Sequence, residues 1–459
     1  MDKEVQNVER HINVDEEEMS SSTLTFKYRS STSFLENSLE EKNAQLAFSS
    51  LNLQSLKECA LNPNRPVFLD RFNVMTNGAS LDVHDQGETG LCWIHSGLMY
   101  LESCFHLHKI DKRLSLSPHY LAFYDKLEKS IVFLSKAKKE KDSRTLYHLL
   151  NDNGPILTDG GTWGMFLHLI NKYGLATRDE VILTHQATHT SQMNQAWRNI
   201  LRNLAAEEKT SRQEAIKKVF DFLTRCLGFI PRLREKLIEI PFNNKEENDE
   251  TKKNETPVYK SMERLKFANL FDFNKKTHVC LTHGVDREEG WYASYSTNDV
   301  NDDEQHKFYV VHDIELLATA AYKSLKKGEC VPFTADIRYM RDKKSSILDP
   351  ETFDYDTLLG TNVLHNDKKR NMNQGCIVPN HAMLLVAVER ENNKFKQWKI
   401  LNSWGKRGKH AGYLIMSHKW FQMFVFEITV RKTHIHNLPP SSNVKKCTPW
   451  DIFSTVAGS

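Results

Sequence analysis

A glutamine, two glycines and a cysteine stand close together at residues 86–92, and this combination could support nucleophilic chemistry. The residues that follow Cys92 contain no helix breaker as far as Leu101. The pattern predicts a loop that leads into a helix with Cys92 in its first turn. The helix dipole and a nearby imidazolium would lower the pKa of the Cys92 thiol and favour a thiolate at neutral pH. The Gln86 amide and the Cys92 backbone N–H could then bind one oxyanion together.

A histidine and an asparagine in the second half of the chain are the partners that such a cysteine needs. His381 begins an apolar stretch, and Asn402 ends the next apolar stretch. On neighbouring strands, His381 would pair with Cys92 and protonate the leaving amine, while Asn402 would orient the imidazole. Trp404 would shield that hydrogen bond from water. Each residue alone is more often structural, but together they indicate a cysteine hydrolase.

The segment 158–164 contains Gly160, Gly161 and Trp163 between two helical patterns. Adjacent glycines allow another backbone to approach closely, which suits a substrate-binding loop. An ordinary turn between helices would give the same pattern.

Composition limits the classes of protein that fit the chain. A length of 459 residues allows two or three domains or one large two-lobed unit. The net charge of +3 gives no indication of a polyanionic partner. The eight cysteines form no Cys-x-x-Cys motif, so we expect no metal site and no cofactor. Neither a signal peptide nor an apolar run of membrane-spanning length is found, which predicts a cytoplasmic protein with free thiols and no membrane partner.

Changes in composition divide the chain into five segments. Residues 1–45 are acidic and serine-rich, which predicts a disordered arm. Residues 46–189 have helical patterns and carry the cysteine, 190–272 resemble a helical insertion, 273–446 are strand-rich and carry the histidine and asparagine, and 447–459 form a tail. A helical half and a strand-rich half predict an α+β fold of two lobes with a cleft between them.

Several local elements can be predicted in more detail. Residues 43–60 are predicted to form a helix, and Ser117 and Pro118 suit the cap and first position of another. Residues 391–394 are predicted to be the turn of a hairpin, and the polar tract 243–255 to be a surface loop.

The combination of motifs resembles the papain superfamily and, within it, the bleomycin hydrolase family of cysteine aminopeptidases. The resemblance covers residues 70 to 459. It is carried by these motifs: Gln86-Gly87-x-x-Gly90-x-Cys92-Trp93, Asn380-His381-Ala382-Met383, Asn402-Ser403-Trp404-Gly405, Asp159-Gly160-Gly161-x-Trp163, His410-x-Gly412-Tyr413-Leu414, Phe424-Val425-Phe426-Glu427 and Pro449-Trp450-Asp451.

The resemblance implies a papain-like fold, with a helical lobe, an antiparallel β-barrel-like lobe and a helical insertion. It implies a cytosolic aminopeptidase that hydrolyses N-terminal peptide or amide bonds through a Cys92 thioester, with Gln86 in the oxyanion hole. Gly160 and Gly161 would hydrogen-bond the substrate backbone, and Trp163 belongs to the same substrate-binding loop.

The resemblance also implies features beyond the catalytic groups. Trp93 and Trp404 would shield the site. A C-terminal tail that ends at Ser459 would lie in the cleft and restrict substrates to peptides with a free N-terminus, although a frayed terminus is the usual default. The family forms a homohexameric ring, so a hexamer is expected here.

Four positions depart from the family pattern without removing a catalytic group. Thr89 replaces a cysteine that forms a disulfide in secreted relatives, which fits a reducing compartment. Leu91, His95 and Leu401 replace other residue types near the motifs, and we interpret them as the first positions to consider for a changed substrate preference.

Two alternatives stay open. The first is a catalytically silenced ring-forming protein that binds peptide or nucleic acid, suggested by these substitutions and by the lysine-rich segments 136–141 and 368–370. Such segments are usually solvated surface. The second is an endopeptidase with an open cleft.

Overall fold

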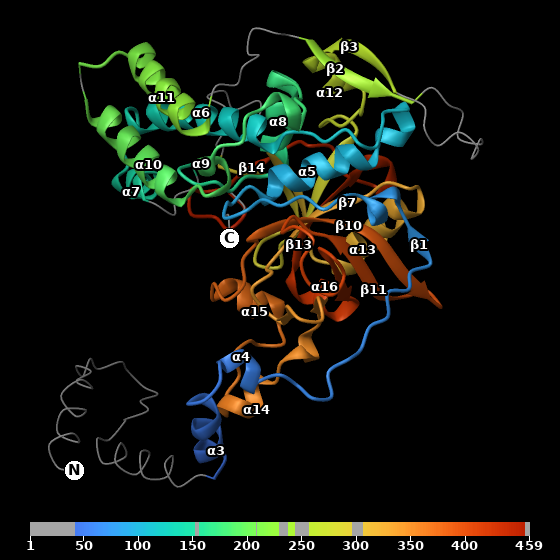
Figure 1. Cartoon of the computed structure of the whole chain (residues 1–459). Coiled ribbons are helices and arrows are strands. Elements are labelled where there is room, and N and C mark those ends of the chain that lie inside the picture. Colours follow the sequence, from blue (N-terminus) through green and yellow to red (C-terminus); the bar gives the residue numbers. More distant parts are fainter. Residues whose placement is uncertain are drawn as a thin grey trace, which may run out of the picture. The chain divides into compact units, whose positions relative to one another are not determined.

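The computed structural model describes residues 42–151, 156–207, 209–228, 237–243, 257–295 and 306–454 (Figure 1). The chain divides into two compact units. The smaller unit contains residues up to Leu61 together with Asp354–Val363, and the larger unit contains all other residues.

The smaller unit contains α3 (Lys42–Leu51), α4 (Leu56–Cys59) and α14 (Tyr355–Leu359). The prediction of one helix from residue 43 to residue 60 is wrong, because the chain leaves the helix after Leu51 and starts again at Leu56. Ser55 caps the second helix by accepting from the Glu58 backbone N–H, and the Glu58 side chain bonds back to the cap. The arm predicted for residues 1–45 lies outside the described residues except for its last part, which belongs to α3.

The helical lobe of the larger unit is built around the long helix α6. Helices α5, α7, α8, α10 and α11 all contact α6 (Figure 1). The Ser117 side chain accepts from the Tyr120 N–H and Pro118 occupies the first turn, so the predicted start of this helix is confirmed. The helices of this lobe are α5 (Cys92–Ser103), α6 (Pro118–Ala137), α7 (Ser143–Leu150), α8 (Trp163–Tyr173), α9 (His185–Thr188), α10 (Ser191–Ala206), α11 (Arg212–Leu227) and α12 (Arg264–Asn269).

The segment predicted as a helical insertion, 190–272, contains α10, α11 and α12. It also contains an antiparallel strand pair, β2 (Leu237–Phe242) with β3 (Val258–Glu263), which the sequence analysis did not predict. The predicted surface loop 243–255 lies outside the described residues, apart from Asn243.

The strand-rich lobe is one sheet in the order β14-β5-β6-β4-β13-β7-β10-β11-β12-β9-β8, with β1 added to β10. Most neighbours are antiparallel, and three pairs are parallel: β4 with β6, β9 with β12, and β5 with β14. The strands are β1 (Val74–Met75), β4 (His278–His283), β5 (Gly290–Ala293), β6 (Lys307–Val311), β7 (Val331–Ala335), β8 (Arg341–Asp342), β9 (Ile347–Leu348), β10 (His381–Glu391), β11 (Lys394–Leu401), β12 (Tyr413–Ser417), β13 (Val425–Arg431) and β14 (Lys445–Lys446).

Strand β10 is the element that connects the two lobes. One side of the sheet contacts α5, which packs against β7 and β10 (Figure 1), and α13 (Ile314–Lys326) also packs on β10. Residues 381–388 are therefore all buried. Strand β10 turns into β11 at Asn392 and Asn393, whose φ angles of 47° and 62° suit a two-residue hairpin turn, so the predicted hairpin is confirmed. This pairing brings the first residue of β10 close to the residue after β11.

Two smaller helices, α15 (Lys368–Asn373) and α16 (His418–Phe424), complete this lobe. Lys368 is only 8% exposed, and its ammonium donates to the Val425 carbonyl. The expectation of a solvated basic segment at 368–370 is therefore wrong for Lys368.

Candidate active site

Cys92 is the first residue of α5 and is fully buried. Its Sγ accepts a hydrogen bond from the Ala382 backbone N–H at 3.4 Å. The preceding loop turns at Gly87, where φ is 63° and an added Cβ would lie 2.6 Å from the Thr188 carbonyl oxygen. Only glycine fits that position, and the tight turn leads the chain into the helix with Cys92 at its start.

His381 begins β10 and is also fully buried. Its Nε2 lies 2.8 Å from Asn402 Oδ1, and the Trp404 ring stacks over the imidazole at 4.6 Å. An amide oxygen can only accept, so the ring proton of the neutral imidazole is on Nε2 and Nδ1 has the free lone pair. No described residue forms a hydrogen bond with Nδ1. The nitrogen that a catalytic base would use is therefore available.

The structure brings Cys92, His381 and Asn402 together, although Cys92 Sγ bonds to the Ala382 N–H and not to His381 Nδ1. Burial raises the pKa of Cys92 to about 11, an effect only partly offset by nearby backbone N–H groups. Burial also lowers the pKa of His381 to about 4, against the opposing effect of Asn402. In this arrangement burial opposes the expected resting thiolate, and the surrounding backbone N–H groups offset its effect on the Cys92 pKa only in part.

Gln86 belongs to the loop before Cys92 and is 2% exposed. Its Oε1 accepts from the Ser403 hydroxyl at 2.7 Å, and its Nε2 donates to the Thr89 carbonyl at 2.5 Å. These two bonds fix the orientation of the amide and leave one Nε2 hydrogen for another acceptor. The sequence analysis did not assign a role to Ser403; its position directly after Asn402 was the available signal.

Trp93 connects the cysteine helix to the glycine loop. Its indole Nε1 donates to the Asp159 carbonyl at 2.9 Å, and a Cβ added at Gly161 would lie 2.4 Å from the Trp93 ring. The structure thus places Gly160 and Gly161 beside the cysteine helix, and Trp163 begins the next helix, α8. Trp93 was expected to shield the site; here it packs the two loops against each other.

A small pocket adjoins these groups. Its lining residues come from both lobes: Trp93, Ser96, Gly161, Trp163, Pro332, Phe333, Thr334, Ala382, Glu427 and Thr429. Trp93 and Ala382 are the direct sequence neighbours of Cys92 and His381. The pocket therefore lies next to the candidate catalytic residues, at the boundary of the two lobes.

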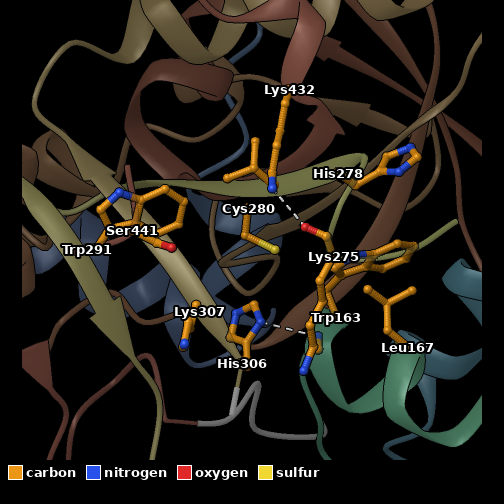
Figure 2. Close-up of a pocket in the computed structure, with 12 residues that line it drawn as sticks. Trp163, Leu167, Lys275, His278, Cys280, Trp291, His306, Lys307, Lys432 and Ser441 are labelled. Carbon is orange, nitrogen blue, oxygen red and sulfur yellow. Dashed lines mark hydrogen bonds between the residues drawn. The ribbon is translucent and has the colours of Figure 1, made fainter. Parts of the chain in front are cut away.

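A second cavity of about 210 Å³ lies between α8 and the sheet. Figure 2 shows Cys280 and His306 at its edge, and with Glu427 they form the one group of potential metal ligands found among the described residues. The Gly164 N–H donates to His306 Nδ1 at 3.2 Å, which leaves the proton of the neutral ring on Nε2, 3.4 Å from Glu427 Oε2. His306 therefore offers no lone pair to an ion, and this donor set does not fit a metal.

The part of the C-terminal tail that the structure describes, 447–454, is held by both lobes. Arg144 of α7 lies over the Trp450 ring at 4.1 Å, and Asp451 pairs with Arg287 at 2.8 Å. Ser454 is 1% exposed. Ser459, the predicted end of a tail in the cleft, lies outside the described residues.

The three substituted positions near the motifs are buried in the core. Leu91 and His95 are each 1% exposed, and Leu401 is 0% exposed. His95 Nδ1 lies 3.3 Å from His84 Nδ1, and His84 pairs with Glu102 at 2.9 Å. These side chains face the protein interior, so their burial does not support the interpretation that they determine substrate preference.

A two-lobed α+β unit, in which a cysteine at a helix start meets a histidine–asparagine pair on the opposing sheet, defines a papain-like cysteine peptidase. The chain belongs to the Peptidase C1-like family, whose sequence profile matches residues 25–453. It is similar to aminopeptidase G of Lactobacillus delbrueckii subsp. lactis, with 28% identity over 388 residues, which cover 81% of this chain and 86% of that protein. It is also similar to bleomycin hydrolase of Gallus gallus, with 28% identity over 398 residues, which cover 81% and 85%.

The fold is also seen in a solved structure. The crystal structure of pepw from Lactobacillus rhamnosis matches with a TM-score of 0.81 and 23% identity, and the match covers 96% of this chain and 100% of that one. The papain-like fold and the assignment to the bleomycin hydrolase type of cysteine aminopeptidase are thus confirmed. Among the described helices, none combines the length and apolar character needed to cross a membrane.

Proposed function

We propose that the protein acts in the cytosol on peptides with a free N-terminus, hydrolysing the N-terminal peptide or amide bond with Cys92 as nucleophile. The proposal rests on the contact between the two lobes, which brings Cys92 next to the strand that begins with His381. Cys92 Sγ lies 3.4 Å from the backbone nitrogen of Ala382, the residue after His381, and Asn402 holds the far side of the imidazole at 2.8 Å. The relatives named aminopeptidase and bleomycin hydrolase support this class of substrate.

Acylation would begin with a rotation about the Cys92 side chain, which moves Sγ from the Ala382 N–H to His381 Nδ1. The thiol proton passes to Nδ1 and the sulfur attacks the substrate carbonyl carbon. The oxyanion accepts from the Cys92 N–H and from the second Nε2 hydrogen of Gln86. His381 then gives its Nδ1 proton to the leaving amine nitrogen as the C–N bond breaks, and a thioester remains.

Deacylation would use the same groups with a water molecule. Nδ1 of His381 accepts a proton as the water oxygen attacks the thioester carbonyl. The C–S bond then breaks, the sulfur of Cys92 regains the proton, and the free carboxylic acid leaves. Asn402 keeps the imidazole in the same orientation during both half-reactions.

The C-terminal tail would limit cleavage to the N-terminal bond. Arg144 and Arg287 hold Trp450 and Asp451, and this anchoring of the tail supports the proposal. Free cysteines at all eight positions support a reducing compartment. A homohexamer is expected from the family likeness, and mass photometry of the purified protein would test it.

The experiment that tests the activity is release of the fluorophore from aminoacyl amides. The unmodified protein should hydrolyse them, Cys92→Ala should lose the activity, and Cys376→Ala, which removes a free and partly exposed cysteine, should keep it. Equal rates in the unmodified protein and Cys92→Ala would refute the proposal. Deleting 452–459 should add cleavage of N-acetylated peptides, whereas an open-cleft endopeptidase would cleave them without the deletion.

A catalytically silenced binding protein is the second candidate, because Cys92 and His381 both favour the neutral form in this structure. An epoxysuccinyl probe separates the two candidates. It should label Cys92 at neutral pH in an active peptidase and should not label it in a silenced protein. Peptide or nucleic-acid binding without turnover, falling steeply with salt for a nucleic acid, would favour the second candidate.

A further inference from the structure

A buried charge cluster lies directly behind the glycine loop. Lys126 and Lys129 of α6 are 1% and 0% exposed, and Asp125 and Asp159 are 0% and 6% exposed. Two ammonium groups face two carboxylates, so the cluster has no net charge. Burying such pairs gains little stability compared with apolar packing, which suggests another reason for their presence.

Lys129 uses all three of its ammonium protons on this loop and its support. The ammonium donates to Asp125 Oδ2 at 2.7 Å, to the Thr158 carbonyl at 2.9 Å and to the Gly160 carbonyl at 2.7 Å. The two carbonyls flank Asp159. One fixed cation therefore holds the peptide planes 158–159 and 160–161.

The bond to the Gly160 carbonyl determines where the next N–H points. In a trans peptide the C=O of one residue and the N–H of the next point in opposite directions, and no cis peptide bond is found in the described chain. The Gly161 N–H therefore points away from Lys129. Gly161 lines the small pocket together with Trp93 and Ala382, and no described residue accepts a hydrogen bond from its N–H. A buried donor without a protein acceptor at the wall of a pocket indicates a ligand acceptor.

Asp159 fixes the same loop to the cysteine segment. Its Oδ1 accepts from Lys126 at 2.6 Å, and its Oδ2 accepts from the Gly90 N–H at 3.3 Å and from the Thr190 hydroxyl. Its backbone carbonyl accepts from Trp93 Nε1. One residue thus holds the loop before Cys92 and the glycine loop at a fixed separation.

We propose that Lys129 and Asp159 are positioning residues: they hold the Gly160–Gly161 peptide so that the Gly161 N–H faces the pocket and donates a hydrogen bond to a carbonyl oxygen of the bound peptide. The proposal rests on the proposed function, since it names the groups that orient the substrate-binding loop of that site. Neither side chain touches the substrate, and both act through the backbone that they hold.

The test uses the double variant Lys129→Met with Asp125→Leu, which removes both partners of a buried pair and avoids an unpaired charge. KM for aminoacyl amides should rise at least fivefold, while kcat per titrated active site and the rate of Cys92 alkylation by iodoacetamide stay within twofold. A merely structural role would lower the fraction of active sites that can be titrated and leave KM unchanged. The control is Lys172→Met, which removes a half-exposed lysine that pairs with Glu128 of α6 and does not contact the loop.

A measurement on the unmodified protein covers the case in which the double variant does not fold. Binding of a peptide aldehyde should slow hydrogen exchange in proteolytic fragments that contain Gly161. A folded variant with unchanged KM, or no change in exchange on binding, would overturn the proposal. If the unmodified protein hydrolyses no aminoacyl amide, the proposed function fails. That result differs from an unchanged KM in the variant and from unchanged hydrogen exchange on binding, which refute only the positioning role.

Discussion

The hydroxyl of Ser403 gives the sharpest test of how the Gln86 amide, which we propose binds the oxyanion, is oriented. It donates to Gln86 Oε1 at 2.7 Å, and the neighbouring backbone bond from Gln86 N to the Ser403 carbonyl, at 2.8 Å, does not need the side chain. Ser403→Ala therefore removes one hydrogen bond and keeps the local backbone. Gln86 Oε1 becomes a buried acceptor without that donor.

The size of the effect follows from these contacts. Leaving a buried acceptor unsatisfied costs about 1–3 kcal/mol of stability. The amide is not released completely, because its Nε2 still donates to the Thr89 carbonyl at 2.5 Å and a flipped amide would bring two oxygens together. A loss of about 1.4 kcal/mol in the transition state corresponds to a roughly tenfold lower kcat/KM. Gln86→Ala, which removes the donor itself, should lower kcat by about 10²–10³.

The assay is kcat/KM for an aminoacyl amide, corrected for the number of active sites, in the four proteins of a double-mutant cycle. Ser403→Ala should cost about tenfold when Gln86 is present and little when Gln86 has been replaced by alanine, because the hydroxyl acts through that amide. An equal loss in both backgrounds would refute the reasoning. So would unchanged activity in the single variant, provided that its lower unfolding free energy shows that the hydrogen bond is lost.

Three further predictions follow. Arg287→Ala, which frees Asp451, should add cleavage of N-acetylated peptides, whereas Lys445→Ala in the exposed pair with Glu288 should not; no change in either would contradict tail anchoring. Burial lowers the pKa of His381 to about 4, so between pH 6.5 and 4 the unfolded chain binds a proton that the folded chain does not. The unfolding free energy, measured in urea, should therefore fall by up to about 3 kcal/mol as the pH falls from 6.5 to 4. The fall should be smaller in His381→Gln. Gly161→Ala should lower kcat/KM at least tenfold, since its Cβ would meet Trp93 at 2.4 Å; normal activity would show that the loop can move.

Local signals in the sequence were sufficient for many elements. Ser117 and Pro118 mark a helix start, and Asn392 with Asn393 marks a hairpin, because each depends on the backbone conformation of only a few residues. The helix predicted for 43–60 failed where Ser55 offered a competing local cap. The glycine loop was predicted to approach another backbone, and in the structure it packs against Trp93.

Burial of polar groups could not be predicted in the same way. Lys126 and Lys129 lie on a helix between other charged residues, a pattern typical of a solvated face. Asp159 and Asn194, the partners of Lys126, and the Thr158 and Gly160 carbonyls, which accept from Lys129, are distant in sequence. They meet the two lysines only when α6 is enclosed by its neighbours. The sequence likewise does not show that Leu91, at the N-cap of α5, and His95, within α5, are buried in the core, and both are interpreted from it as specificity residues.

The arrangement around Cys92 suggests how a neutral resting site can become reactive. A thiol with a pKa of about 11 and an imidazole with a pKa of about 4 exchange no proton while Sγ bonds to the Ala382 N–H. The attraction between a thiolate and an imidazolium stabilises the pair only after Sγ turns to Nδ1. The Cys92 N–H and the free Nε2 hydrogen of Gln86 can stabilise that negative charge before they stabilise the oxyanion, since both charges form beside the start of α5. In the proposed mechanism the oxyanion hole and the activation of the nucleophile therefore depend on the same donors, and the contact of Ser403 with Gln86 should influence both.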